Sequence, residues 1–386
     1  MKLKIKVALV RLLQSFLSFI PVKKNRIMFY AHNRKGYVCN PAALMTAIQQ
    51  KYPEEYELIW VTGFPESCEK REGITVVRQR SLEYFRYFIR TKYFVTNDMV
   101  DESLVKKRGQ IFIDTWHGGG AYKKVGIGTI GEDEVFAENF LKWYGRLDYF
   151  LSSCQMCTDL YAKAFYLKPD IFLETGTPRN DIFFRKQEET KQKVRDFYHI
   201  SPKTKIILFA PSFQHSAPEK EQYDRNVLQN VVEELHRKTK EDWVMLYRAH
   251  YYSEVDKKTE QLWLKDGNAY YEMQDLLYTA DILVTDFSSC IWDFALTGRP
   301  IILMENRLAE YESEDRGFFV PYEFWPYIKI QDLSQLVDTI LQYEAEDFSD
   351  RYAEHMQKMG SFETGSACEQ VIDTIFRGEE YEKYER

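Results

Sequence analysis

The sequence of 386 residues is poor in cysteine, and this scarcity limits the classes of protein to which it can belong. Six cysteines cannot build a disulfide framework in a chain of this length, so we expect a reduced, cytosolic protein. Cys154 and Cys157 have the spacing of a redox or zinc pair, but no second such pair and no pair of histidines accompanies them. We therefore interpret them as a structural pair, with a metal site as the alternative.

Acidic residues are absent from the start of the chain, where none precedes Glu54, while basic residues are frequent. An apolar segment at 12–20 lies in this basic region, but it is interrupted and shorter than the about 20 apolar residues that span a bilayer. A signal peptide would end in small residues, without the trailing Lys23 and Lys24. We predict that residues 1–25 form an amphipathic segment that lies on an anionic membrane; the alternative is a helix docked on the first domain.

Hydrophobic residues make up 45% of the chain and aromatic residues 16%, which suffices for two cores and excludes a disordered protein. A net charge of -7 argues against general nucleic-acid binding. The sequence contains neither an internal repeat nor a low-complexity segment. The length is most simply that of two domains.

Short apolar runs alternate with helical patterns in two series, which predicts an α/β fold with two doubly wound, Rossmann-like domains. The break between the series falls near 185–204. We therefore predict domains at 26–195 and 196–386, with the last helices able to pack back on the first domain. The predicted strands are 26–31, 57–61, 74–77, 93–96, 111–115, 147–152, 171–175, 205–210, 243–248, 281–285 and 300–304.

A strand-to-helix junction at 281–296 is the strongest signal of a ligand site. An apolar run ends at Asp286, and Ser288 and Ser289 then precede a segment with helical spacing. Backbone N–H groups and the dipole at a helix N-terminus favour a phosphate. Ligands of open α/β sheets lie beyond the carboxyl ends of the strands, where these three side chains would be. The junction therefore predicts a phosphorylated or nucleotide-linked substrate.

A histidine and three glycines follow another predicted strand. The histidine has the pKa to take a proton from a hydroxyl near neutral pH, and the glycines let the backbone approach a ligand closely. We predict a catalytic base here; the alternative is a tight turn with a hydrogen-bonded histidine. The segment contains, in order, His117, Gly118, Gly119, Gly120, Lys123 and Lys124.

Three further strand ends carry side chains suited to a phosphate or nucleotide. Arg179 is able to hold a phosphate, although helix capping explains this loop equally well. Ser212 either reaches a base or ribose or caps a helix. Arg248 and His250 suit a diphosphate, because charge that develops on phosphoryl oxygens needs fixed cations; the alternative is a pair of surface side chains.

No Asp-x-Asp sequence occurs in the chain. Enzymes that clamp a diphosphate through a metal ion usually need such paired carboxylates. Histidine, arginine and helix N-termini would have to meet the charge instead, so we predict a reaction that needs no metal and no cofactor.

Five motifs occur in order along 26–375, and these are Trp116-His117-Gly118 with Lys123-Lys124, Gly176-Thr177-Pro178-Arg179-Asn180-Asp181, Phe209-Ala210-Pro211-Ser212, Arg248-Ala249-His250, and Thr285-Asp286-Phe287-Ser288-Ser289 with Asp293-Phe294. Together they resemble the CDP-glycerol glycerophosphotransferase family of teichoic acid and capsule synthesis. The resemblance implies a GT-B-like fold and transfer of glycerol phosphate from CDP-glycerol to a hydroxyl of a membrane-linked acceptor, with release of CMP. Related members use CDP-ribitol. It also implies that His117 is the base, and that His250 and the serine pair lie beside the donor diphosphate.

The resemblance assigns the acceptor side, with Lys123 and Lys124, to 26–195 and the nucleotide donor to 196–386, in a peripheral protein on the cytoplasmic face of the cell membrane. Gly119-Gly120-Ala121 stands where the family usually has Thr-Pro, and Arg248-Ala249-His250 replaces Arg-Pro-His. These departures leave the acceptor and the polyol open. The alternatives are a GT-B glycosyltransferase with a nucleotide-sugar donor and a non-catalytic nucleotide- or polymer-binding subunit of a synthesis complex.

Overall fold

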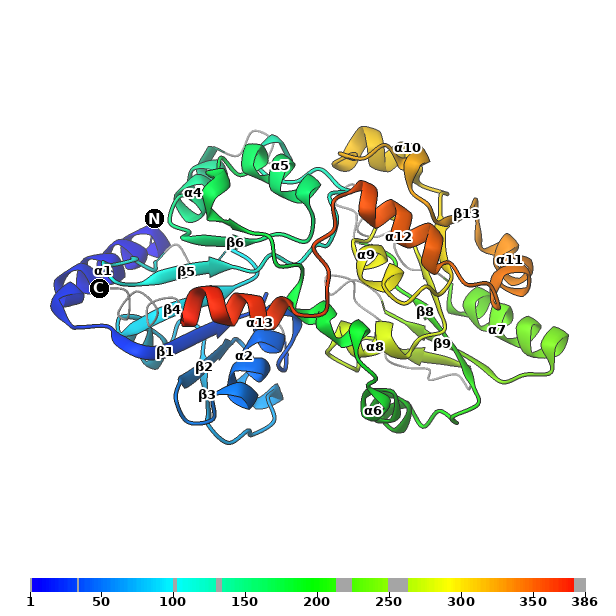
Figure 1. Cartoon of the computed structure of the whole chain (residues 1–386), viewed down its shortest axis with the longest axis horizontal. Helices are drawn as coiled ribbons and strands as arrows, with labels where there is room; N and C mark the ends of the chain where they lie inside the picture. Colours follow the sequence, from blue (N-terminus) through cyan, green and yellow to red (C-terminus); the bar gives the residue numbers. More distant parts are fainter. Residues whose placement is uncertain are drawn as a thin grey trace. The chain divides into compact units, whose positions relative to one another are not determined.

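The computed structural model describes residues 2–32, 35–99, 103–129, 134–212, 224–248 and 263–377. Two compact units make up the chain (Figure 1). Unit 1 contains Met1–His117, Val125–Asp181 and Ser361–Arg386, and unit 2 contains Gly118–Lys124 and Ile182–Gly360. Neither unit is therefore a single continuous piece of chain.

Unit 1 is built on a parallel sheet of seven strands. The strands are β1 (Lys23–Tyr30), β2 (Glu57–Thr62), β3 (Ile74–Arg78), β4 (Thr91–Thr96), β5 (Ile111–Asp114), β6 (Tyr149–Leu151) and β7 (Phe172–Leu173). Their order is β3-β2-β1-β4-β5-β6-β7, and the central strands are largely apolar because they are buried on both faces. The order reverses between β1 and β4, and such a reversal is where doubly wound sheets bind ligands.

The helices of unit 1 include one that returns from the end of the chain. They are α1 (Lys2–Phe16), α2 (Cys39–Lys51), α3 (Leu82–Phe88), α4 (Glu134–Tyr144), α5 (Gln155–Ala164) and α13 (Ala367–Val371). α13 lies beside α2 and continues as a π-helical turn over Ile372–Phe376 (Figure 1). Ile375 and Phe376 are buried in the core cluster that also contains residues of α2 and β1. The C-terminal segment thus completes the core of unit 1.

The cysteine pair begins a helix in unit 1. The thiol of Cys154 accepts a hydrogen bond from the backbone N–H of Cys157 at 3.4 Å and so caps α5. Both side chains are buried. This cap is a structural role for the pair.

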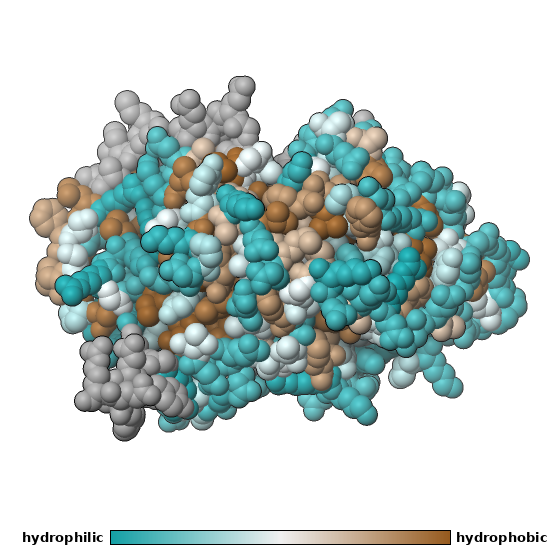
Figure 2. Space-filling view, turned by 45° about the horizontal axis from the view of Figure 1, so that its top comes forward, coloured by the Kyte–Doolittle hydropathy of each residue, from teal (hydrophilic) through white to brown (hydrophobic). Residues whose placement is uncertain are grey.

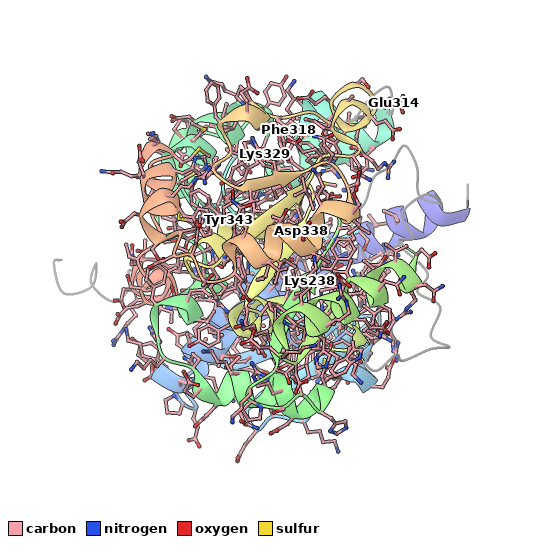
Figure 3. All side chains as sticks on the ribbon, turned by 90° about the vertical axis from the view of Figure 1, so that its right-hand side faces the viewer. Lys238, Glu314, Phe318, Lys329, Asp338 and Tyr343 are labelled. Atoms are coloured by element: carbon pink, nitrogen blue, oxygen red, sulfur yellow. The ribbon has the colours of Figure 1, made fainter. Side chains whose placement is uncertain are left out.

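Unit 2 is built on a parallel sheet of six strands. The strands are β8 (Lys205–Phe209), β9 (Trp243–Tyr247), β10 (Leu264–Asp266), β11 (Ile282–Thr285), β12 (Ile301–Met304) and β13 (Ile328–Ile330). Their order is β10-β9-β8-β11-β12-β13, so the reversal lies between β8 and β11. The helices are α6 (Glu188–Tyr198), α7 (Arg225–Thr239), α8 (Met273–Thr279), α9 (Cys290–Ala295), α10 (Leu308–Glu310), α11 (Leu336–Tyr343) and α12 (Ser349–Lys358). α7 and α11 lie side by side, and an ion pair of 2.8 Å joins Lys238 Nζ to Asp338 Oδ1 (Figure 3).

The passage from unit 1 to unit 2 lies at Asp181 and Ile182, earlier than the predicted boundary between 195 and 196. The reason is that α6 packs on α8. The backbone N–H of Gln187 also donates to the hydroxyl of Tyr278 at 2.9 Å, which anchors the start of α6 in unit 2. The helix therefore belongs to the unit that follows it.

The prediction of two doubly wound α/β domains is confirmed, and each predicted strand overlaps a strand of the structure. Sequence analysis missed β10 and β13, which are three-residue strands at the two edges of the second sheet. Strands this short carry almost no periodic signal.

Candidate active site

The reversal of strand order in unit 1 brings three loops together. His32 follows β1, Asp98 follows β4 and His117 follows β5, and these three strands are neighbours in the sheet. The rings of His32 and His117 meet edge to face, with centroids 4.3 Å apart and an interplanar angle of 75°. The predicted base therefore lies where a doubly wound sheet binds its ligand.

The backbone holds His117 in one tautomer. Nδ1 lies 2.8 Å from the carbonyl oxygen of Asn97, and because a carbonyl oxygen only accepts, Nδ1 carries the hydrogen and Nε2 the lone pair. The ring keeps some exposed surface but is otherwise surrounded by protein, and this desolvation lowers the pKa of His117 well below its ordinary value. The charge of His32 lowers that pKa further. A neutral imidazole with a basic Nε2 is the form that accepts a proton from a hydroxyl.

The turn that precedes this imidazole is strained and closely packed. Trp116 has a φ of 51°, in the left-handed region that residues other than glycine seldom adopt. The carboxylate of Asp114 accepts a hydrogen bond from the backbone N–H of Trp116 at 2.8 Å and so stabilises the turn. The indole of Trp116 lies against the imidazole of His117, with centroids 4.4 Å apart and planes tilted by 32°. These contacts define where the base points.

Sequence reasoning missed His32 and Asp98. Nδ1 of His32 lies 3.2 Å from Oδ2 of Asp98. Burial acts to raise the pKa of Asp98, but the hydrogen bond from His32 and the nearby positive charge outweigh it and lower that pKa, so the carboxylate stays ionised. Their position becomes a signal only once the strand order is known, because the ends of β1 and β4 then flank the ligand crevice.

Arg179 belongs to the same unit, and its loop is tied to the turn of His117. The backbone N–H of Arg179 donates to Oδ1 of Asn40 at 3.1 Å. The amide of Asn40 in turn donates to the carbonyl oxygen of Thr115 at 3.0 Å. The positive charge of Arg179 is among those that lower the pKa of His117. The structure thus brings Arg179 near the predicted base, and its binding of a phosphate stays a prediction.

Ser212 and Asp286 meet at the reversal of strand order in unit 2, after β8 and β11. The buried carboxylate of Asp286 accepts hydrogen bonds from the backbone N–H groups of Ser212 at 2.8 Å and Phe287 at 2.6 Å. Burial raises the pKa of Asp286. Its carboxylate therefore shapes the two strand-end loops.

Ser288 and Ser289 stand where β11 gives way to α9. Ser288 Oγ accepts a long hydrogen bond, of 3.5 Å, from the backbone N–H of Cys290. Ser289 immediately precedes α9 and makes no capping hydrogen bond through its side chain. Both serines keep some exposed surface. α9 is only six residues long, so the dipole that the sequence analysis invoked is short.

The glycine-lysine segment lies in unit 2, although the prediction placed it with the acceptor-side domain. A Cβ on Gly119 would overlap Cδ1 of Trp292, and one on Gly120 would lie 2.7 Å from Cε3 of the same indole. The backbone of Lys123 pairs with that of Phe318, which lies on the same side of unit 2 as Lys329 (Figure 3). Only glycine lets the chain lie this close to Trp292.

Lys123 is thereby placed with the residues predicted to bind the donor. Burial lowers the pKa of Lys123 to about 8, as does the charge of Arg316, while the carboxylates of Asp286 and Asp315 act to raise it. A lysine with this pKa is still mostly protonated at neutral pH. Lys124 next to it donates its backbone N–H to the carbonyl oxygen of Gly317 at 3.1 Å.

Arg248 follows β9, one strand away from the reversal in unit 2. Its guanidinium donates to the carbonyl oxygens of Gly267 at 2.8 Å, Tyr270 at 2.6 Å and Tyr271 at 3.0 Å. These bonds brace the loop after β10. His250 lies outside the described residues. Diphosphate binding by both side chains stays a prediction.

A comparison with family models decides the class of protein. The model of CDP-glycerol:poly(glycerophosphate) glycerophosphotransferases matches residues 12–377, nearly the whole chain. The chain belongs to this family. The resemblance inferred from the five motifs is therefore confirmed, and so is the prediction that the protein is a transferase.

Relatives of this chain include enzymes named for two polyol phosphates. A teichoic acid glycerol-phosphate transferase of Staphylococcus aureus is 29% identical over 376 residues, which cover 94% of this chain and 95% of the relative. The teichoic acid ribitol-phosphate polymerase TarL of the same species is 28% identical over 285 residues, which cover 70% of this chain and 48% of the relative.

A solved structure of the wall teichoic acid polymerase TagF shares the fold of this chain. Its TM-score is 0.85 at 22% identity, and the match covers 97% of this chain and 94% of that chain. The GT-B-like fold expected from the sequence is thereby confirmed. Gly119 and Gly120, which stand where the family usually has Thr-Pro, pack on Trp292.

The described residues of this family member offer neither a metal cluster nor a membrane-spanning helix. Among those residues, no group of three or more His, Cys, Asp or Glu side chains could hold a metal ion. The metal-independent reaction stays a prediction. Likewise, no described helix is both long and apolar enough to cross a bilayer.

Proposed function

We propose that the protein transfers a polyol phosphate, most simply glycerol phosphate, from a CDP-polyol to a hydroxyl of a membrane-linked acceptor, and that CMP is released. The product would be a teichoic acid, a capsule or a related cell-surface phosphopolymer. The observation that carries the proposal is the tautomer of His117, whose Nδ1 is bound to the carbonyl of Asn97. The proposal is supported by this proton acceptor, Nε2, at the strand ends of a member of the glycerophosphotransferase family.

The proposed reaction follows from the chemistry of these groups. Nε2 of His117 takes the proton of the acceptor hydroxyl, and the oxygen attacks the phosphorus that bears the polyol. The new O–P bond forms as the bond between the two phosphates of the donor breaks, and CMP leaves with the bonding electrons. Charge that grows on the leaving phosphate calls for fixed cations and N–H or O–H donors. Unit 2 offers Lys123 and the hydroxyls of Ser288 and Ser289 for this task.

We also propose that the protein lies on the cytoplasmic face of the membrane, where a lipid-linked acceptor would be available. The apolar side chains of the N-terminal helices support this proposal. Leu13 is 59% exposed, Phe16 69% and Phe19 81%. Figure 2 shows hydrophobic surface at the edge of unit 1 that carries α1. Such side chains next to basic residues suit the interface of an anionic bilayer.

The test is release of CMP by the purified protein. CDP-glycerol, CDP-ribitol and a set of nucleoside-diphosphate sugars are each incubated with the protein and a membrane extract as acceptor, and the released CMP or nucleoside diphosphate is measured by chromatography. We expect CMP from a CDP-polyol, and the donor that yields it identifies the polyol. The same run in excess EDTA should give an unchanged rate if no metal takes part.

The control is the extract with a transferase of known activity. If that control releases CMP and this protein releases none from either CDP-polyol, the proposal is wrong. Turnover of a nucleotide sugar would then assign a glycosyltransferase. A tenfold loss in EDTA, restored by a divalent cation, would contradict the metal-independent reaction.

A further inference from the structure

The pair formed by His32 and Asp98 has no part in the reaction described so far. Both imidazoles of unit 1 turn Nδ1 toward the loop after β4: His117 to the carbonyl of Asn97 at 2.8 Å and His32 to the carboxylate of Asp98 at 3.2 Å. The two partners differ in charge. A carbonyl group is satisfied by a neutral imidazole, whereas a carboxylate favours the imidazolium. Neighbouring residues of one loop thus hold two histidines in different ways.

We propose that His32, oriented by Asp98, is a positioning residue for the base His117. The inference rests on the proposed function, because it needs a base that acts on an acceptor hydroxyl. His32 meets the ring of His117 edge to face at 4.3 Å, while the indole of Trp116 lies 4.4 Å from it with its plane tilted by 32°. Two aromatic contacts of different geometry, added to the bond to Asn97, determine the plane of the imidazole and the direction of Nε2.

The pair also acts on the charge of His117. Among the described residues, three charged groups act on the pKa of this imidazole: His32 after β1, Asp98 after β4 and Arg179 in the loop after β7. His32 and Arg179 oppose protonation of His117, and Asp98 favours it. His117 is therefore kept neutral before the reaction. When His117 takes up a proton, the ionised carboxylate of Asp98 is nearby to stabilise the positive charge. A preorganised charge of this kind stabilises a transition state.

The place of the pair in the fold agrees with such a role. β1 and β4 are the two strands between which the order of the sheet reverses, and His32 and Asp98 follow their carboxyl ends. A ligand of unit 1 is expected at this position. His32 and Asp98 are thus at the point in unit 1 where an acceptor hydroxyl must be presented to His117.

The test separates ring packing from charge with two variants of the full-length protein. His32→Phe keeps an aromatic ring but removes the titratable group, and His32→Ala removes both. The partly exposed His236 on α7 supplies the matched control, His236→Ala. The titration of His117 is followed by NMR on ligand-free protein labelled with ¹³C-histidine, and kcat and KM are measured with the CDP-polyol that wild type uses.

We expect the titration midpoint of His117 to move to higher pH in both His32 variants, because a positive neighbour is lost. His32→Ala should also lower kcat by about 10–100-fold with little change in the KM of the donor, since a small misplacement of a catalytic group costs up to about 100-fold. His32→Phe should retain more of kcat at high pH, and His236→Ala should change neither quantity.

An unchanged midpoint in both His32 variants overturns the proposal, whatever their turnover. Failure of wild type to release CMP contradicts the proposed function instead, and the NMR measurement still decides whether His32 and His117 are coupled. Thermal unfolding of each variant reports whether it is folded. His32→Phe preserves most of the side-chain volume, so the test stands if His32→Ala does not fold.

Discussion

Desolvation of His117 has a direct consequence for the pH at which the protein works. Because burial and the charge of His32 hold the pKa of His117 well below 6.5, the imidazole is neutral and basic throughout the neutral range. Protonation removes the lone pair of Nε2, so kcat/KM should fall only below pH 6.5. A pH profile of kcat/KM measures this fall.

His117→Gln should reduce kcat by about 10²–10⁴-fold and leave donor binding, measured by calorimetry, largely intact.

An acid limb at or above pH 6.5 in wild type would contradict the predicted state of His117. Unchanged turnover in His117→Gln would remove it from the mechanism altogether. His199, at the exposed end of α6, supplies the control: His199→Asn keeps a residue that tolerates the left-handed conformation found there and should change neither quantity.

For single residues, the sequence predicts a role in the site only where the neighbouring residues in the chain form a pattern. His117 was predicted because three glycines and two lysines follow it. His32 and Asp98 stand alone in their loops, and only the pairing of β1 with β4 makes them part of a cluster. The sequence likewise cannot reveal that the guanidinium of Arg248 is bound by three carbonyl groups.

Among the elements, the segment Gly118–Lys124 depends most on its glycines. Gly119→Ala should lower the free energy of unfolding by about 1–3 kcal/mol, because its methyl group would overlap the buried Trp292. Gly128→Ala is the matched control, since no described atom lies within 4 Å of its added methyl group. Denaturant unfolding of the two variants measures the difference. Equal stability of the two would show that Gly119 is not packed on Trp292.

The elements themselves were largely predictable, because buried parallel strands are continuous apolar runs. The unit to which each element belongs was not predictable from the sequence. Sequence order places Gly118–Lys124 with β5, yet packing on Trp292 places this segment in unit 2. In the same way, α6 follows unit 1 in sequence but packs on α8. Both outcomes depend on contacts between residues far apart in the chain.

For the whole molecule, attachment to a membrane is the property to test. Leu13→Ser, Phe16→Ser and Phe19→Ser together should reduce sedimentation with anionic vesicles, because they remove exposed apolar surface from the N-terminal helices. The control replaces Leu82 and Phe324 by serine; these residues lie elsewhere and are more exposed than Leu13, and this variant should sediment as wild type does. Equal sedimentation of all three proteins would contradict a membrane role for this end of the chain.

Unit 1 is formed by segments from both ends of the chain, and this determines the order in which the two units can fold during synthesis. Ile27 and Phe29 of β1 belong to the same buried cluster as Ile375 and Phe376, near the other end of the chain. While the ribosome is still translating the middle of the chain, the first sheet lacks part of its core and exposes apolar surface that chaperones bind. All pieces of unit 2 lie within 118–360. The second unit is therefore the first that the nascent chain can complete.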